Sequence, residues 1–175
     1  MGRDKALLDA GSETLGHVVA RVVSAAVGSA VLVGDPRRYA PLGYPVIPDL
    51  YPGEGPLGGI ITALAHTQAD WNLIVACDMP ALKEEFLQKL LDAAEREATD
   101  VLLPAGPSGQ PEPLCAVYRK RSGPLLEAGF RSGIRKVTAA ARGVAGLRTV
   151  LLPVAEVSVF QNVNTPEEWA AHGSE

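Results

Sequence analysis

Short apolar runs alternate along this chain with longer segments whose apolar residues recur at helical spacing. Residues 15–27 place apolar side chains at the i, i+3, i+4 and i+7 positions of an amphipathic helix that ends near Gly28, and residues 83–98 repeat that spacing. Residues 30–33 predict a short buried strand. Residues 71–76 are apolar apart from Asn72 and predict a strand buried on both faces of a helix-covered sheet. This alternation predicts an α/β fold with a largely parallel sheet.

The other expected elements are shorter. Strands are predicted at 46–47, 101–103, 114–118 and 149–152, and helices after Gly59, at 124–128 and at 136–142. A last helix is predicted to begin at Thr165, with Thr165 as the N-cap, Pro166 in the first turn and Glu168 completing a capping box.

Composition and charge narrow the possible classes of protein. The 175 residues suit one domain, and 47% hydrophobic residues with a net charge of −4 are typical of a folded chain without the basic surface of a nucleic-acid binder. No apolar stretch is long enough to span a bilayer, so we expect no membrane insertion. The two cysteines, Cys77 and Cys115, are too few for a disulfide framework or a zinc cluster and favour a reduced, cytoplasmic setting.

Two aspartates stand where an open α/β sheet binds its ligands, just beyond the carboxyl ends of strands. Asp78 follows the strand at 71–76 and is either a turn residue or a ligand of Mg²⁺, two interpretations that position alone leaves equal. Asp49 follows the strand at 46–47 and either stabilises the next loop as an Asx turn or contacts a nucleotide, which we favour.

Two further segments have both a structural and a functional interpretation. The turn Gly55-Pro56-Leu57-Gly58-Gly59 either lets a helix approach the sheet or offers backbone N–H groups at a helix N-terminus to an anion or a base edge. Lys5 lies either in a solvated tail, the usual role of a terminal charge cluster, or at the edge of the crevice as a point charge for phosphate.

Six segments, taken together and in this order, resemble the molybdenum cofactor guanylyltransferase family. They are residues 1–8, 33–36, 48–49 with 55–59, 76–80, 112–114 and 162–166. The resemblance implies a three-layer α/β/α sandwich of the nucleotide-diphospho-sugar transferase type. It implies one nucleotidyltransferase domain over residues 1–175, with a nucleotide-binding half at about 1–100 and a pterin-facing half at about 101–175.

The resemblance also implies an activity: transfer of GMP from GTP to molybdenum-molybdopterin, which yields molybdopterin guanine dinucleotide and pyrophosphate. In that family pattern, Lys5 contacts the GTP phosphates, Asp49 binds GTP, and Asp78 binds Mg²⁺ and the nucleotide. Gly34 and the turn Gly55, Pro56, Leu57 and Gly58 fall in nucleotide-contacting segments, although Gly34 stands near the position of an asparagine. Asn162 and Asn164 fall on the pterin side. Proteins of molybdenum cofactor assembly and molybdoenzymes are the implied partners.

One departure from the family pattern concerns the beginning of the chain. Family members carry a first strand and a Leu-Ala-Gly-Gly phosphate loop before the equivalent of Met1. We therefore expect this sequence to lack a central strand, to leave the neighbouring strand edges unpaired, to bind GTP poorly and to be unstable or prone to associate.

Other functions stay open at this point. A cytidylyl enzyme of the same pathway or a sugar-phosphate nucleotidyltransferase is the nearest alternative. An inactive module that binds or chaperones the cofactor is the alternative from another class.

Overall fold

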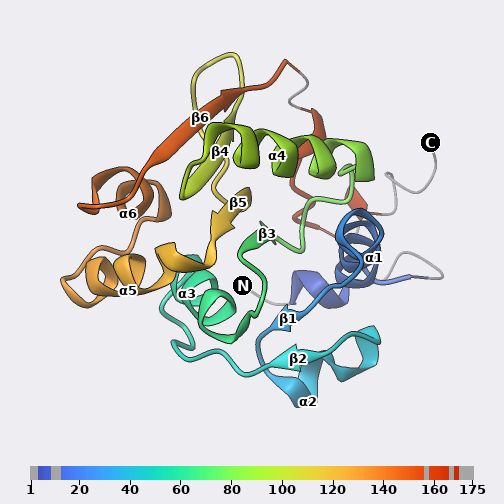
Figure 1. Cartoon of the computed structure of the whole chain (residues 1–175). Helices are drawn as coiled ribbons and strands as arrows, with labels where there is room; N and C mark the ends of the chain where they lie inside the picture. The colour runs from blue at the N-terminus through green and yellow to red at the C-terminus, as the bar shows by residue number, and fades with distance from the viewer. Residues whose placement is uncertain (1–3, 9–12, 156–157, 166–167, 170–175) are drawn as a thin grey trace.

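The strands of this protein form two separate groups. The computed structural model describes residues 4–8, 13–155, 158–165 and 168–169. Strand β1 (Leu32–Val33) pairs in parallel with β2 (Val46–Ile47), and a four-stranded sheet has the order β3-β5-β4-β6 (Figure 1). Strands β3, β4 and β6 share one direction and β5 runs opposite to them. The predicted α/β class with a mostly parallel sheet is confirmed, with β5 as the antiparallel member.

The elements follow the predicted order. The strands of the larger sheet are β3 (Trp71–Val75), β4 (Val101–Ala105), β5 (Cys115–Arg119) and β6 (Thr149–Pro153). The α-helices are α1 (Leu15–Val27), α2 (Pro36–Tyr39), α3 (Pro56–His66), α4 (Glu84–Glu97), α5 (Gly123–Arg131) and α6 (Val137–Gly143). The 3-10 helices are η1 (Lys5–Leu7), η2 (Ala40–Leu42), η3 (Lys120–Ser122) and η4 (Ser158–Phe160).

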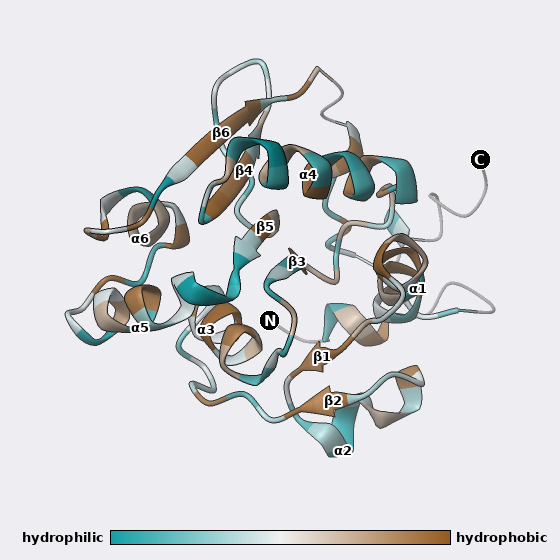
Figure 2. Cartoon of the chain, viewed as in Figure 1, coloured by the Kyte–Doolittle hydropathy of each residue, from teal (hydrophilic) through white to brown (hydrophobic). Residues whose placement is uncertain are grey.

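Helices cover both faces of the larger sheet, which gives three layers. Side chains alternate across a strand, so Val101 and Leu103 of β4 face the core made with α3, α5 and α6, while Leu102 faces the core made with α4. Every residue of β4 is buried. Figure 2 shows the same division, with α4 turning a hydrophilic face outward. The implied α/β/α layering is therefore present around β4 and β5.

The boundaries of the longer helices agree with the sequence pattern. Helix α1 ends at Gly28, whose φ of 80° places it in the left-handed region that glycine enters without a Cβ penalty. The strand at 101–103 extends further than predicted, through Pro104 to Ala105. Pro104 is tolerated because its missing N–H faces the side where β5 pairs only with Val101 and Leu102.

Two strands predicted to be buried are only partly buried. Every residue of β3 has intermediate exposure, and Val31, just before β1, is 54% exposed. The prediction is wrong in this respect because β3 is an edge strand and β1 belongs to the other sheet. A cavity of about 940 Å³ lies between them. Among the described residues, no strand pairs with the edge of β3 opposite β5 or with the edge of β1 opposite β2.

Three smaller expectations can also be compared with the structure. Residues 36–42, where the sequence pattern predicts neither a helix nor a strand, form α2 and η2. Glu168 N donates to Thr165 Oγ1 at 3.1 Å, as an N-cap at Thr165 requires, whereas Pro166 lies outside the described residues. None of the described helices has the length and apolar character needed to cross a bilayer.

Candidate nucleotide site

A lysine, an aspartate and an asparagine from three distant segments meet at the end of β3. Lys5 Nζ donates to Asp78 Oδ2 at 2.9 Å and to Asn164 Oδ1 at 2.6 Å. The Asp78 side chain is 15% exposed, while Lys5 is more open to solvent. Lys5 therefore lies in a folded segment against the carboxyl end of the sheet, and its interpretation as a solvated tail is wrong.

Backbone contacts hold these three segments in place. The Asp4 side chain accepts from Ala6 N at 3.1 Å and so caps η1, the short helix that carries Lys5. Val163 N donates to the backbone oxygen of Asp78 at 2.8 Å, which places Asn164 beside Lys5. Asn162, one residue before Val163, lines the cavity at the same end of the sheet. The site is thus built from both ends of the described chain.

Asp4 joins this site to the segment after β1. Its Oδ2 accepts from Tyr39 Oη at 2.6 Å and from Arg38 Nε at 2.8 Å. Burial of Tyr39, together with its hydrogen bond to Asp4, raises the pKa of the Tyr39 hydroxyl to about 12. Tyr39 is therefore a neutral donor at physiological pH, and it ties α2 to η1.

Gly34 fits tightly against the ring of Tyr39. A Cβ built on Gly34 would stand 2.3 Å from Tyr39 Cε2, and the φ of Gly34 is 154°. Gly34 N donates to Ile47 O at 2.9 Å and continues the pairing of β1 with β2. Packing against Tyr39 thus requires a glycine at position 34, and the backbone N–H of Gly34 already donates a hydrogen bond within the protein.

Asp49 occupies a separate turn before α3. Its Oδ1 accepts from Tyr51 N at 3.0 Å and from Thr62 Oγ1 at 2.8 Å, and Leu50 N donates to Thr62 Oγ1 at 3.1 Å. This is the Asx turn of the structural interpretation. Among the described residues Asp49 contacts this turn and Thr62 rather than Lys5 or Asp78, so its contact with a nucleotide stays a prediction.

The turn Gly55–Gly58 starts helix α3 beside the cavity. Gly55 caps the helix with a φ of 86°, and Pro56 lines the cavity. Gly58 has a packing role, because a Cβ there would stand 2.8 Å from Tyr51 Cβ. The Leu57 side chain is fully buried in the core. Any contact of Leu57 or Gly58 with a ligand must therefore use the backbone.

Glu112 lies in the 112–114 segment that carries the family resemblance, but the sequence analysis gave it no role in the site. It lines the cavity together with Asp78, and its Oε1 accepts from Leu114 N at 3.0 Å. Burial, with a contribution from the negative charge of Asp78, raises the pKa of the Glu112 carboxyl above its usual value. Glu112 lies in an irregular segment between β4 and β5, so no periodic pattern marks it.

Asp78 and Glu112 are the carboxylates to consider for a metal ion here. Among the described residues, no group of three or more His, Cys, Asp and Glu side chains is arranged to hold a metal. Mg²⁺ is commonly held by only one or two carboxylates, with substrate phosphates and water as the other ligands. Two neighbouring hard oxygen donors at the open end of a sheet fit that mode of binding.

Cys77, next to Asp78, has the properties of a packing residue. Burial, and secondarily the charge of Asp78, raises the pKa of its thiol to about 11. Cys115 is buried in β5, and burial raises its pKa to about 12. Because the thiolate is the nucleophilic form, neither cysteine is activated for catalysis.

The helix-covered sheet has the nucleotide-diphospho-sugar transferase fold of its solved structural neighbours, and Lys5 and Asp78 lie at the carboxyl end of this sheet. The family model described as the MobA-like NTP transferase domain matches residues 1–147. The chain belongs to this family.

Relatives and a solved structure agree with this assignment. A probable molybdenum cofactor guanylyltransferase of Deinococcus radiodurans is 35% identical over 97% of this chain and 85% of its own length. One of Clostridium perfringens is 36% identical over 55% of this chain, and the match spans about half (48%) of that relative. The crystal structure of molybdopterin-guanine dinucleotide biosynthesis protein A from Archaeoglobus fulgidus is similar with a TM-score of 0.77 and 29% identity. The structural match covers 95% of this chain and 87% of the Archaeoglobus fulgidus chain.

Proposed function

We propose that this protein transfers GMP from GTP to molybdenum-molybdopterin, with release of pyrophosphate. The observation that carries the proposal is the contact of Lys5 with Asp78 at the carboxyl end of β3, in a chain of the MobA-like family. The names of the Deinococcus radiodurans and Clostridium perfringens relatives support guanylyl transfer in particular.

The chemistry needs positioned charges rather than a covalent nucleophile. The terminal phosphate of the pterin attacks the α-phosphorus of GTP, a new P–O bond forms, and the bond to pyrophosphate breaks. Such a step is accelerated by holding the reactants in line and by stabilising the charge on the phosphoryl oxygens. Lys5 supplies a fixed positive charge for this purpose. The protonated thiols of Cys77 and Cys115 agree with direct transfer.

We propose Asp78, assisted by Glu112, as the residues that hold Mg²⁺. When bound, Mg²⁺ supplies charge neutralisation to the triphosphate. Lys5 already contacts one oxygen of Asp78, which supports a role for its ammonium group at the same phosphates. The role of Asp78 is thus to orient Lys5 as well as to provide a carboxylate oxygen.

The remaining predicted site residues divide between two substrates in this proposal. The nucleotide is contacted by Asp49 and by the backbone of Gly34 and of residues 55–58, within the half at about 1–100. The pterin is contacted by Asn162 and Asn164, within the half at about 101–175. The close approach of Asn164 to Lys5 supports a pterin phosphate at the Lys5 end of the cavity.

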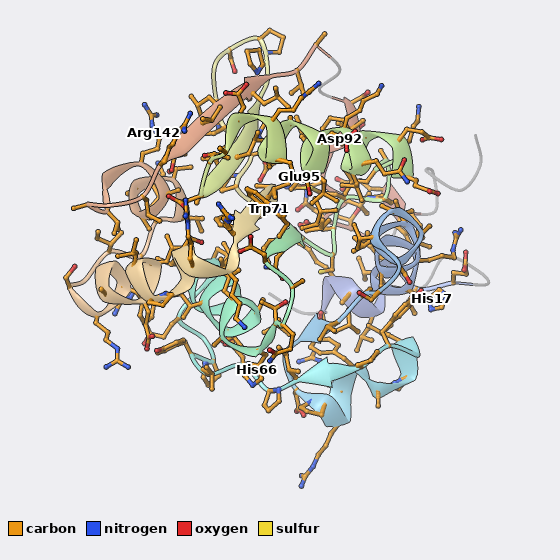
Figure 3. All side chains as sticks on the ribbon, viewed as in Figure 1. His17, His66, Trp71, Asp92, Glu95 and Arg142 are labelled. Carbon is orange, nitrogen blue, oxygen red and sulfur yellow. The ribbon has the colours of Figure 1, made fainter. Side chains whose placement is uncertain are left out.

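A pyrophosphate-release assay with molybdenum-molybdopterin tests the proposal. We expect GTP to be used and CTP to compete weakly, and we expect Asp78→Asn to abolish release. Asp92→Asn, on the exposed face of α4 (Figure 3), is the matched control and should leave the rate unchanged. Preference for CTP would assign a cytidylyltransferase. Cofactor delivery unaffected by Asp78→Asn would assign a binding module instead.

A Mg²⁺ titration tests the role of Glu112. Glu112→Gln should raise the Mg²⁺ concentration that gives half of the maximal rate, because one oxygen ligand loses its charge. The melting temperature should change little, because glutamine has nearly the same size and keeps an acceptor oxygen for Leu114 N. An unchanged Mg²⁺ dependence would remove Glu112 from the metal site.

The cellular setting follows from the same proposal. Two free cysteines, of which Cys115 is buried and Cys77 is partly buried, are in keeping with a reducing cytoplasm. The product would be handed to molybdoenzymes, with other proteins of cofactor assembly as partners.

A further inference from the structure

A buried threonine of helix α3 lies against the turn that carries Asp49. Thr62 is fully buried, and it is the one buried residue of α3 that has a polar side chain. The other buried side chains of this helix belong to an apolar core, and they are Leu57, Ile60, Ile61 and Leu64. A hydroxyl group in such a core is unfavourable unless it is hydrogen-bonded. The partners of Thr62 therefore explain why a polar residue stands at this position.

The Thr62 hydroxyl joins the turn to the helix by three short contacts. Its Oγ1 accepts from Leu50 N at 3.1 Å. It also lies 2.8 Å from Asp49 Oδ1 and 2.9 Å from Gly58 O, and its single proton can serve only one of these two acceptors at a time. A carboxylate is a stronger acceptor than a carbonyl, so we assign the proton to Asp49.

The two oxygens of the Asp49 carboxylate have different surroundings. Oδ1 accepts from Thr62 Oγ1 and also from Tyr51 N, at 3.0 Å. Oδ2 has no hydrogen-bonding partner among the described residues. Asp49 is partly exposed and follows the carboxyl end of β2, which is where α/β sheets bind their ligands. One oxygen of this carboxylate is thus committed to the turn, and the other is available to a donor from outside it.

Tyr51 fixes the far side of the same turn. Its Oη donates to Glu127 Oε1 at 2.7 Å, and the centroid of its ring lies 4.8 Å from that of Phe130, which like Glu127 belongs to α5. Helices α3 and α5 lie side by side and share one core (Figure 1). The backbone of the turn is therefore held by contacts that do not involve the carboxylate, and the Thr62 hydroxyl acts on the orientation of the Asp49 side chain.

We propose that Thr62 is a positioning residue for nucleotide binding. Its hydroxyl holds Oδ1 of Asp49 within the turn, and this orientation leaves Oδ2 to accept a hydrogen bond from an N–H or O–H group of the nucleotide. A carboxylate that is fixed in advance loses less side-chain entropy when the ligand binds, so Thr62 strengthens binding without touching the ligand. The inference rests on the proposed function, because it takes Asp49 as a nucleotide-binding residue.

The effect of Thr62 should be on affinity rather than on the transfer step. Among the described residues, the contacts of Asp49 are with its own turn and with Thr62 and do not include Lys5 or Asp78. An interaction made equally in the ground state and in the transition state changes KM and leaves kcat unchanged. Loss of the Thr62 hydroxyl should therefore raise KM for GTP alone.

Thr62→Val tests the proposal, because valine has nearly the same shape and lacks the hydroxyl. In the pyrophosphate-release assay, we expect KM for GTP to rise about tenfold, the usual effect of losing one hydrogen bond to a charged group, with kcat unchanged. Thr62→Ser keeps the hydroxyl, so its KM should stay within about twofold of the wild-type value. Thr62→Cys, in which a weak S–H donor replaces the hydroxyl, should give an intermediate KM. Calorimetry with GTP alone should show the same order of affinities.

Thr99 provides a matched control for the loss of a buried hydroxyl. It is also fully buried, and its Oγ1 donates to Val101 O at 2.9 Å, at the amino end of β4. Thr99→Val should lower the melting temperature, as Thr62→Val does, but should leave KM for GTP unchanged. A KM that rises equally in both valine variants would mean that the cause is a general loss of stability, and would overturn the proposal.

A double-mutant cycle tests whether Thr62 acts through Asp49. Asp49→Asn alone should raise KM for GTP, because an amide replaces the charged acceptor. In the Asp49→Asn protein, Thr62→Val should raise KM by less than about twofold, because the carboxylate that it positions is already gone. A full tenfold effect of Thr62→Val in both backgrounds would show that the two residues act independently.

The remaining outcomes separate this inference from the proposed function. A KM that rises with Asp49→Asn but not with Thr62→Val would overturn only the role of Thr62, and so would a Thr62→Ser protein with the KM of Thr62→Val. A wild-type chain that releases no pyrophosphate from GTP would overturn the proposed function itself, together with this inference.

Discussion

Lys5 Nζ and Asp78 Oδ2 lie 2.9 Å apart although 73 positions separate the two residues in the chain. We expect Lys5→Met to lower the transfer rate by about two to three orders of magnitude, the usual cost of removing one donor that stabilises transition-state charge. The measurement is the turnover number with saturating GTP. Lys89→Met on the exposed face of α4 is the control. A Lys5→Met protein with full activity would contradict the assigned role.

The burial of Tyr39 and its hydrogen bond to Asp4 predict that the free energy of unfolding depends on pH in the alkaline range. The pKa of Tyr39 is raised to about 12 in the folded protein, above its unfolded value of 10.0. The stability that this group contributes is therefore complete below pH 10 and lost as pH rises toward 12. The difference in free energy of unfolding between wild type and Tyr39→Phe should be constant up to about pH 10 and should then shrink.

Urea denaturation at a series of pH values measures this difference. Tyr118, whose pKa burial also raises, is present in both proteins, so its contribution cancels. A difference that stays constant up to pH 12 would show that the Tyr39 hydroxyl is not held by Asp4 in solution.

The contact of Gly34 with Tyr39 predicts a stability loss on adding a methyl group. Gly34→Ala would place a Cβ against the aromatic ring at a φ that L residues rarely adopt, and should cost about 1–3 kcal/mol of unfolding free energy. Gly59→Ala in α3, where a Cβ meets no atom within 4 Å, should instead be neutral or stabilising by up to about 1 kcal/mol. Thermal unfolding of the two variants and the wild type measures these changes in stability. Equal changes in Gly34→Ala and Gly59→Ala would contradict the prediction.

The contacts of the Asp100 carboxylate predict that the free energy of unfolding depends on pH in the acid range. Burial disfavours its charge, but Arg148 N at 2.9 Å and the guanidinium of Arg121 outweigh that effect and lower the pKa of the carboxyl. Asp100→Asn should lose about 1–3 kcal/mol at neutral pH. Because the folded pKa is depressed, this difference should persist above about pH 4 and vanish as pH falls below it.

Chemical denaturation from neutral to acid pH measures the effect of Asp100→Asn. Asp92→Asn on the exposed face of α4 should show no such dependence. A difference between wild type and Asp100→Asn that is the same at acid and neutral pH would mean that the carboxylate charge is not the stabilising feature.

Local sequence pattern predicted much of this fold. Helical spacing located α1 and α4, and short apolar runs located β1 and β3, because these signals depend on neighbours within one or two turns. The half-burial of β1 and β3 was not predictable in this way. An apolar run shows that a strand avoids water, but not which strand will lie beside it.

The candidate site was predicted in part. Asp78 was found because polar residues after strands of an α/β sheet lie at the ligand edge. The contact of Lys5 with Asn164 joins residues 159 positions apart, and no local period encodes it. Glu112 belongs to one of the six segments that resemble the family, but its role was not predicted because it lies in an irregular segment, and its raised pKa results from burial that only the folded chain creates.

The bond from Val163 N to Asp78 O, with Lys5 between Asp78 and Asn164, has a consequence for folding kinetics. Contacts between such distant residues carry a large loop-closure entropy and form late. Recovery of ligand binding during refolding should therefore lag behind recovery of helical signal. A ligand that contacts Lys5, Asp78 and Asn164 would slow the local unfolding of all three segments. Ligand binding would therefore be regained only when these segments have come together, at the end of folding.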